Sequence, residues 1–225
     1  MRIKGFPPSA YKFAKEVAEA RNDEQIRKLS KSKNEDIWDT FVEKELEKIE
    51  KALTLGYNRQ IEKADFDIAA SVQRFKEKRK PDFIAELTKT DVGRIKKLTR
   101  KQPEDLENDI DKSFLNSATR KALISQNEKH LLMEHVTNDL YGDLGNETKT
   151  WANGPNPCPA CAAKSGETVS IYGTYSNGSY YAHLHPRCMC KSTYGKEGKE
   201  SKLGGYVEKF RGAIHKLWNK FYPWA

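Results

Sequence analysis

The sequence predicts an α+β protein that is mainly α, with an elongated helical N-terminal region, a small β module and a C-terminal amphipathic helix. Three observations indicate this fold class. Apolar residues recur at helical spacing up to about residue 142, and the chain then becomes rich in Gly, Asn, Ser, Pro and Tyr. All four cysteines lie in that second stretch. We therefore expect a helical region at 1–142, a Cys/His module at 143–202 and an aromatic, basic helix at 203–225.

The composition favours long helices exposed to solvent rather than one thick globule. Of the 225 residues, 37% are hydrophobic and 32% are charged, and the mean hydropathy is −0.84. No apolar run approaches the roughly 18–20 residues that a membrane-spanning helix needs, so we expect no membrane span. The first residues, 1–8, contain no apolar stretch of the kind that a secretory signal requires.

The helical region divides at residues that start or stop helices. Pro7-Pro8-Ser9 predicts a first helix, and 34–36 (Asn-Glu-Asp) predicts the cap of a second, whose apolar stripe continues towards Phe75. Lys80-Pro81 predicts a break, followed by short helices at 83–87 and 92–98. Another helix start is expected at Pro103, and Ser117 is expected to cap a helix that ends near Gly142. The alternating Lys and Glu residues are typical of a solvated helix surface.

The module is predicted to contain a β-hairpin but too few aliphatic residues for an independent core. Residues 168–172 and 179–183 have strand-like composition, and 173–178 between them has the composition of a hairpin loop. Small folds of this kind usually depend on a metal ion or on disulfide bonds. We therefore expect a cross-link within the module.

Two short clusters have the residue types and spacing of a zinc site. Cys158 and Cys161 form a Cys-x-x-Cys pair, and His185 and Cys188 follow in a second segment. A tight turn presents the first two thiolates to one metal, and a Cys/His pair completes a tetrahedron. Cys190 is an alternative fourth ligand, because residues 188 and 190 face the same side of an extended chain. His183 is a weaker candidate, since it lies in a strand-like stretch.

Other readings of these cysteines fit the sequence less well. Two disulfides need an oxidising compartment and leave His185 without a role. A zinc deaminase needs a His-x-Glu motif upstream, and neither His130 nor His135 belongs to one. A redox Cys-x-x-Cys needs a thioredoxin-like alternation of strands and helices. A zinc ion with four protein ligands has no open position for water, so we expect a structural ion and no enzyme activity.

The positive charge of the chain is concentrated in its last third. The formal net charge is +8; residues 151–225 contain ten Lys and Arg against four Glu, a net of +6, and the first 150 residues contribute +2. Such asymmetry favours a polyanion or an acidic protein surface as partner. The C-terminal helix adds candidate docking residues, which alternatively cover the chain's own module: Tyr206, Phe210, Trp218 and Phe221.

Several motifs, taken in order, resemble the phage minor head protein family, which is the Mu-F-like or head-morphogenesis family. They are 123–128 (Leu-Ile-Ser-Gln-Asn-Glu), a helix to about Leu140, 150–153 (Thr-Trp-Ala-Asn), 158–166 and the His-Pro-Arg-Cys-Met-Cys of 185–190. The resemblance covers roughly 118–193. The chain departs from the family pattern at 164–166 (Lys-Ser-Gly for Leu-Asp-Gly), at Met189 (often Arg) and at 127–128 (Asn-Glu for Thr-Glu), without moving a candidate ligand.

The resemblance implies a virion component that is made in the host cytoplasm. It implies a minor capsid protein bound to the portal or the major capsid protein at the portal vertex, which assists head assembly, DNA packaging or DNA ejection. Packaged double-stranded DNA is then a candidate partner of the basic last third. Two alternatives remain open: a zinc-knuckle nucleic-acid-binding protein that acts in the cell, and a metal-dependent hydrolase with an open zinc site.

Overall fold

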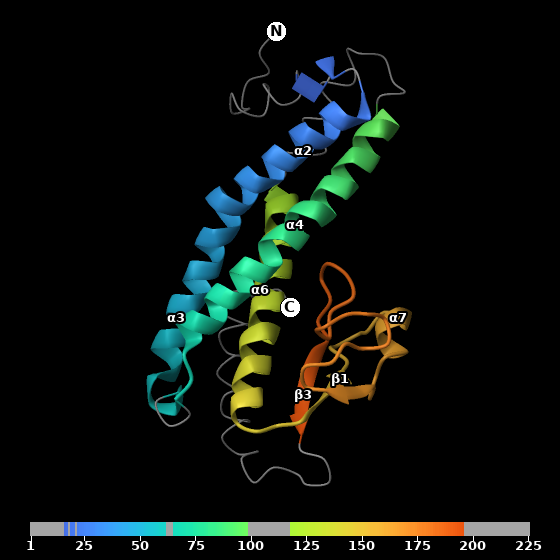
Figure 1. Ribbon diagram of the computed structural model, residues 1–225. Helices are drawn as coiled ribbons and strands as arrows, with labels where there is room; N and C mark the ends of the chain where they lie inside the picture. The colour runs from blue at the N-terminus through green and yellow to red at the C-terminus, as the bar shows by residue number, and fades with distance from the viewer. Residues whose placement is uncertain (1–15, 18, 21, 62–64, 99–117, 196–225) are drawn as a thin grey trace. The chain divides into compact units, whose positions relative to one another are not determined.

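The computed structural model is mainly helical and carries one small antiparallel sheet, which confirms the predicted fold class at this level (Figure 1). It describes residues 16–17, 19–20, 22–61, 65–98 and 118–195. Most of the predicted first helix after Pro7, the helix start expected at Pro103 and the C-terminal helix at 203–225 lie outside these ranges; residues 16, 17 and 19 of the first helix are described and are helical. None of the helices within them is long and apolar enough to cross a membrane.

Contacts within the chain define two compact units. The helical unit comprises Met1–Glu45 and Lys76–Gln126, and the module-bearing unit comprises Leu46–Phe75 and Asn127–Ala225. The helices at 43–61, 68–98 and 118–143 therefore each contribute residues to both units. The domain boundaries expected at 142 and 202 remain predictions.

The first described helix, α2 (Asp23–Ile37), starts earlier than predicted. Its cap is Asn22, whose side chain accepts a hydrogen bond from the backbone N–H of Gln25 at 2.9 Å. Asn34, the predicted cap of a later helix, is instead a buried residue inside α2, and its Nδ2 donates to Asp91 Oδ2 at 3.2 Å. The predicted cap at 34–36 was therefore wrong. Asn34 favours a helix cap, but here its side-chain amide hydrogen-bonds to Asp91 of another helix, so the residue can remain inside α2.

The helix continues through one wide turn into α3. The π-helix η1 (Trp38–Val42) joins α2 to α3 (Glu43–Ile61) without a break. Trp38 is fully buried, and its ring meets that of Phe83 edge-on, with centroids 5.1 Å apart. The predicted stripe does not run unbroken towards Phe75, because α3 ends at Ile61 and a new helix follows.

That new helix, α4 (Ile68–Leu98), passes through Pro81, so the predicted break there was wrong. Asp67 caps its start by accepting from the N–H of Ala70 at 3.0 Å. A proline inside a helix costs about 3 kcal/mol. Burial of Phe83 and Ile84 on the following turn supplies about 1.5–3 kcal/mol for each side chain. The two short helices predicted at 83–87 and 92–98 are therefore parts of one helix.

Helix α6 (Ala118–Asp143) agrees with the helix predicted from Ser117 to Gly142. Most of its described side chains are buried or partly buried, and the buried aliphatic residues recur at helical spacing. They are Ile124, Leu131, Leu132, Val136 and Leu140. A turn with Gly145 at a φ of 72° then leads into the sheet.

The sheet has the order β2-β1-β3, with both neighbours antiparallel to the central strand. Its strands are β1 (Thr148–Ala152), β2 (Thr168–Ser170) and β3 (Lys191–Gly195). Lys149 pairs with Val169 on one side and with Tyr194 on the other. The third strand was not predicted.

The predicted hairpin forms only in part. Its first strand is present but shorter, and residues 179–183 contain bends instead of a strand. The carbonyl oxygen of Tyr181 accepts from the N–H of His183 at 2.7 Å and from Ser179 Oγ at 2.6 Å. These local hydrogen bonds bend the backbone. The strand-like composition of 179–183 therefore wrongly predicted a β-strand there.

Candidate metal centre

The first cysteine pair lies at the start of a one-turn helix, α7 (Pro159–Ala162). Cys158 is its cap, with an extended backbone, and Pro159 occupies the first helical position, where a missing N–H costs nothing. The sulfur of Cys158 accepts from the N–H of Cys161 at 3.5 Å. The Cys-Pro-x-Cys sequence therefore turns both sulfur atoms to the same side.

The second arm is a turn that contains His185 and Cys188. The N–H of Cys188 donates to the carbonyl oxygen of His185 at 3.0 Å. Arg187 has a φ of 66°, a left-handed conformation that is uncommon for residues other than glycine. This conformation reverses the chain, and the histidine ring and the thiol both lie against the sulfur of Cys161.

The two arms meet at distances typical of a tetrahedral site. The Nε2 atom of His185 lies 3.3 Å from Cys158 Sγ and 3.4 Å from Cys161 Sγ, and Cys161 Sγ lies 3.7 Å from Cys188 Sγ. Zinc bonds of about 2.3 Å to sulfur and 2.0–2.1 Å to nitrogen imply edges of about 3.8 Å between sulfurs and about 3.5 Å from sulfur to nitrogen. These three separations match such edges, and Cys161 is the residue at which the two arms meet.

Five residues form two overlapping groups able to hold a metal ion. One group is Cys158, Cys161 and His185; the other is Cys161, Cys188 and Cys190, with ligand atoms within 4.8 Å of one another in each. Cys161 is common to both. All four cysteines are free thiols, so the described geometry contains no disulfide.

A backbone contact leaves one ring nitrogen of His185 able to act as a metal ligand. Its Nδ1 lies 2.9 Å from the carbonyl oxygen of Pro186. Nδ1 must be the protonated nitrogen in this contact, which leaves the lone pair of Nε2 directed at the sulfur atoms of Cys158 and Cys161. The same contact, followed by the Cys158 thiol, raises the pKa of His185.

The thiols differ in how readily they lose a proton. Hydrogen bonds from the backbone and side chain of Cys161 lower the pKa of Cys158 to about 7. Burial raises the pKa of Cys161, and the neighbouring thiols of Cys158 and Cys188 add to that effect. Burial also raises the pKa of Cys190. A bound cation favours thiolates, so without metal the inner thiols are expected to be neutral.

The thiols belong to the hydrophobic core of the module. Trp151, Tyr175 and Ala182 are buried against Cys161, Cys188 and Cys190. The rings of Trp151 and Tyr175 meet edge-on with centroids 5.0 Å apart. A metal ion held by these thiols would therefore lie at the edge of the core itself.

A glycine permits the close approach of two segments beside the cysteines. A Cβ atom at Gly154 would overlap the carbonyl oxygen of Met189. The segment after β1 therefore passes directly against the Cys-Met-Cys stretch. Cys190 Sγ lies 3.8 Å from Asn153 Oδ1 in the same region.

His183, the weaker candidate, is not brought to the cysteines. Its ring packs beside that of His130, with centroids 5.1 Å apart, and it belongs to neither metal-ligand group among the described residues. Burial, followed by the neighbouring His183, lowers the pKa of His130 to about 3. His130 is therefore neutral and buried, and His183 lies partly buried beside it.

Sequence reasoning missed a buried carboxyl group next to the module. Glu134 of α6 accepts from the N–H and Oγ of Ser192, at 2.9 and 2.8 Å. Burial raises its pKa to about 7, although the bonds from Ser192 act in the opposite direction. Lys149 is also fully buried, and its Nζ donates to the carbonyl oxygen of Tyr180 at 2.8 Å. The sequence signal that could have revealed these residues is a charged residue at 134 and at 149, each among residues that are otherwise expected to be buried.

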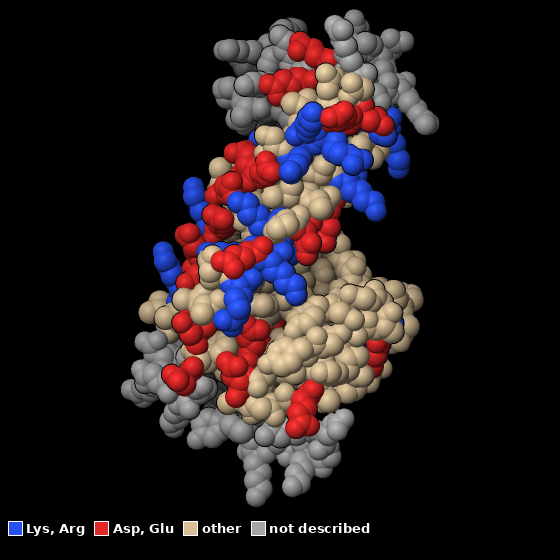
Figure 2. All heavy atoms as spheres, viewed as in Figure 1, with Lys and Arg blue, Asp and Glu red and all other residues tan. Residues whose placement is uncertain are grey.

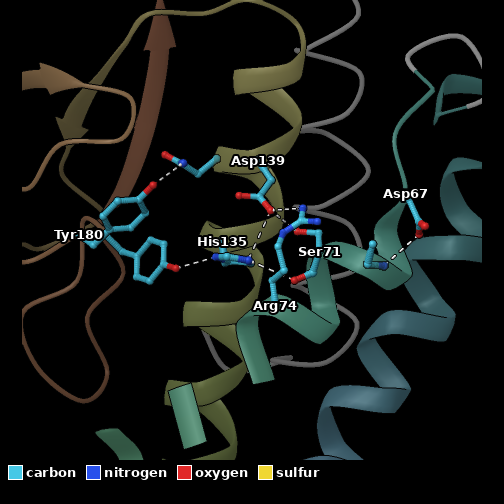
Figure 3. Close-up of polar contacts among 9 residues, drawn as sticks. Asp67, Ser71, Arg74, His135, Asp139 and Tyr180 are labelled. Atoms are coloured by element: carbon cyan, nitrogen blue, oxygen red, sulfur yellow. Dashed lines mark hydrogen bonds and ion pairs between the residues drawn. The ribbon is translucent and has the colours of Figure 1, made fainter. Parts of the chain in front are cut away.

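A second polar cluster missed by sequence reasoning joins α4, α6 and the loop before the second arm (Figure 3). His135 Nδ1 lies 2.7 Å from the hydroxyl of Tyr181, and Nε2 lies 3.1 Å from the carbonyl oxygen of Ser71. Asp139 accepts from Ser71 Oγ at 2.8 Å and from Arg74 at 2.7 Å. An imidazole with its proton on Nε2 satisfies both contacts of His135.

This cluster contains Ser, His and Asp without the geometry of a hydrolase triad. A nucleophilic serine needs its hydroxyl against the imidazole. Here the Ser71 hydroxyl donates to Asp139, and Ser71 is fully buried. The cluster therefore fastens the loop at Tyr181 to the helices and does not activate a nucleophile.

Comparisons with known proteins add no identification. No family model matches the chain, and no curated protein or solved structure matches it significantly.

Proposed function

We propose that this chain is a structural minor head protein of a tailed bacteriophage, with a module closed by one structural zinc ion. The observation that carries the proposal is a chain of contacts at tetrahedral edge lengths: His185 Nε2 lies at such a length from Cys158 Sγ and from Cys161 Sγ, and Cys161 Sγ lies at such a length from Cys188 Sγ. These are also the residues at the centre of the motifs that resemble the head-morphogenesis family. The role of the helices is then to contact the portal or capsid, with the basic last third directed to packaged DNA.

Zinc is the metal that this donor set favours. Three thiolates and one imidazole suit a soft, tetrahedral ion, whereas magnesium and calcium prefer oxygen ligands. We assign Cys188 as the fourth ligand, because its sulfur lies at a tetrahedral edge length from Cys161 and its turn is closed onto His185. Cys190 then lies in the core beside the site.

Four protein ligands imply a structural role for the ion. No position remains for a water molecule that the metal could activate, so the protein is proposed to be non-enzymatic. The ion stabilises a module whose buried residues are mostly aromatic side chains and thiols. The alternative of a zinc knuckle that binds nucleic acid in the cell requires phosphate contacts, which would weaken steeply with salt.

The location of the protein tests the proposal. Particles of the phage or prophage that encodes the chain should be purified through a density gradient, washed at low and at high salt, and analysed by quantitative mass spectrometry. We expect a low, constant copy number per head that resists about 1 M salt. Absence from particles, together with salt-sensitive association with cellular nucleic acid, would support the knuckle alternative. A portal gene next to the reading frame is a second expected result.

A further inference from the structure

The central part of the module, residues 151–190, is almost free of charged residues, in contrast to the rest of the chain. Between residues 151 and 190, only three of forty residues are charged: Lys164, Glu167 and Arg187. Lys164 and Glu167 form an ion pair at 3.2 Å, and each side chain is only about one-fifth exposed. Figure 2 shows the result, a broad area of the module with few red or blue atoms. This depletion is typical of the core of a protein–protein interface.

The exposed residues of this surface are small or aromatic. Tyr172 is 63% exposed, one of two large hydrophobic residues so exposed in the described ranges. Thr174, Ser176 and Asn177 follow it and are also exposed. Tyrosine with Ser, Gly and Asn gives rigid contact area together with adaptable hydrogen bonding.

The two edges of the sheet differ. At β3, the carboxylate of Glu134 accepts from the outward N–H of Ser192, so this edge is covered there. On the β2 side, the backbone groups of residues 167 and 171 hydrogen-bond to the β1 side of the sheet. Because backbone groups alternate in direction along a strand, the N–H and C=O of Thr168 and the N–H of Ser170 point away from the sheet. Both residues are exposed. The β2 edge lacks the Lys, Pro or bulge that commonly protects a free edge.

We propose that β2 pairs antiparallel with β2 of a second copy of this chain, and that the uncharged surface around Tyr172 forms the rest of the interface. Charge selects this partner. Nucleic acid, anionic lipid or an acidic protein would need cations, and this surface carries only Arg187 outside its internal ion pair. Outside residues 151–190 the chain has a net charge of +7. Two positively charged copies can therefore associate through this uncharged surface without electrostatic repulsion at the contact. In a two-fold symmetric dimer, the same surface of each copy contacts its counterpart.

The proposal concerns self-association and does not rest on the virion assignment. The full chain, loaded with zinc, should sediment as a concentration-dependent dimer whose dissociation constant changes less than threefold between 0.1 and 1 M salt. Ser170→Lys places like charges across the two-fold axis, and we expect it to raise the dissociation constant at least tenfold. Leu55→Lys adds the same charge at a site that is 80% exposed on α3 and should leave the constant unchanged.

A second variant guards against misfolding as an explanation. Tyr172→Ser removes the exposed ring without adding charge, and it should also weaken the dimer at least tenfold while zinc content and the circular dichroism spectrum stay those of the wild type. A wild-type chain that remains monomeric at about 100 μM would overturn the proposal. Equal weakening by Leu55→Lys, or dissociation of the wild-type dimer by salt, would overturn it too.

Discussion

The two units reach stability by different means. In the helical unit, aliphatic and aromatic side chains such as Trp38, Phe83 and Ile95 are buried between long helices. In the module, the buried cluster consists of Trp151, Tyr175, Ala182 and three thiols. The helices can bury apolar area along their whole length, whereas a three-stranded sheet with short strands cannot. Under the proposed function, metal binding supplies the additional free energy that such a module needs.

Removing the metal is the strongest test of this difference in how the helical unit and the module are stabilised. Structural zinc sites contribute apparent free energies of about 10–16 kcal/mol near pH 7, far more than any single side chain. We expect a strong chelator to abolish the near-ultraviolet dichroism of Trp151 and Tyr175, while the helical far-ultraviolet signal is largely retained. Zinc should restore the spectrum, and magnesium should not. A module that stays folded without metal would remove the distinction between the two units.

A core truncation in the helical unit should have the opposite pattern. Trp38→Ala removes a fully buried ring that packs against Phe83, and we expect a loss of about 3–5 kcal/mol in the free energy of unfolding of the helices. Chemical denaturation followed by far-ultraviolet dichroism measures this loss. The zinc affinity of the folded variant, determined by competition with a chelator, should stay within about twofold of the wild type. A large fall in zinc affinity would show that the two means of stabilisation are not separate.

The buried carboxyl group beside β3 should make the stability of the module depend on pH. The pKa of Glu134 is raised to about 7, so the folded state retains a proton that the unfolded state loses above about 4.5. This group's contribution to stability is therefore present at low pH and falls between about pH 4.5 and 7, by on the order of 3 kcal/mol. Lys149, Tyr175 and Tyr194 are the other titratable groups near it.

Glu134→Gln isolates this effect, because the amide oxygen can still accept from Ser192. Denaturation at pH 5.5, 6.5 and 7.5 should show the variant gaining stability relative to the wild type as pH rises. The metal ligands titrate identically in both proteins, so their contribution cancels in the difference. A difference that does not change with pH would mean that Glu134 is already ionised in the folded protein.

The sequence predicted which residues lie in the candidate site better than it predicted where helices and strands begin and end. Cys158, Cys161, His185, Cys188 and Cys190 could be found from spacing alone, because a Cys-x-x-Cys turn and a His-Pro-x-Cys turn are local structures. α6 was likewise predictable from its apolar period. Both are features in which neighbouring residues determine the geometry.

The errors arose where distant contacts override local preference. Asn34 favours a cap but is held inside α2 by Asp91, and Pro81 disfavours a helix but is tolerated next to the buried Phe83. The strand β3 escaped notice because its partner, β1, lies about forty residues earlier in the chain. No local pattern contains that information.

The coordination of the metal tests the central claim most directly. X-ray absorption at the zinc edge, with metal content measured on the same samples, should be recorded for the full chain and for the matched variants Cys188→Ser and Cys190→Ser. We predict one zinc per chain with three sulfur ligands and one nitrogen in the wild type and in Cys190→Ser. In Cys188→Ser the ion should be lost or should have one sulfur fewer. An oxygen ligand in the wild type, or loss of zinc from Cys190→Ser alone, would contradict the closed site built from Cys158, Cys161, His185 and Cys188.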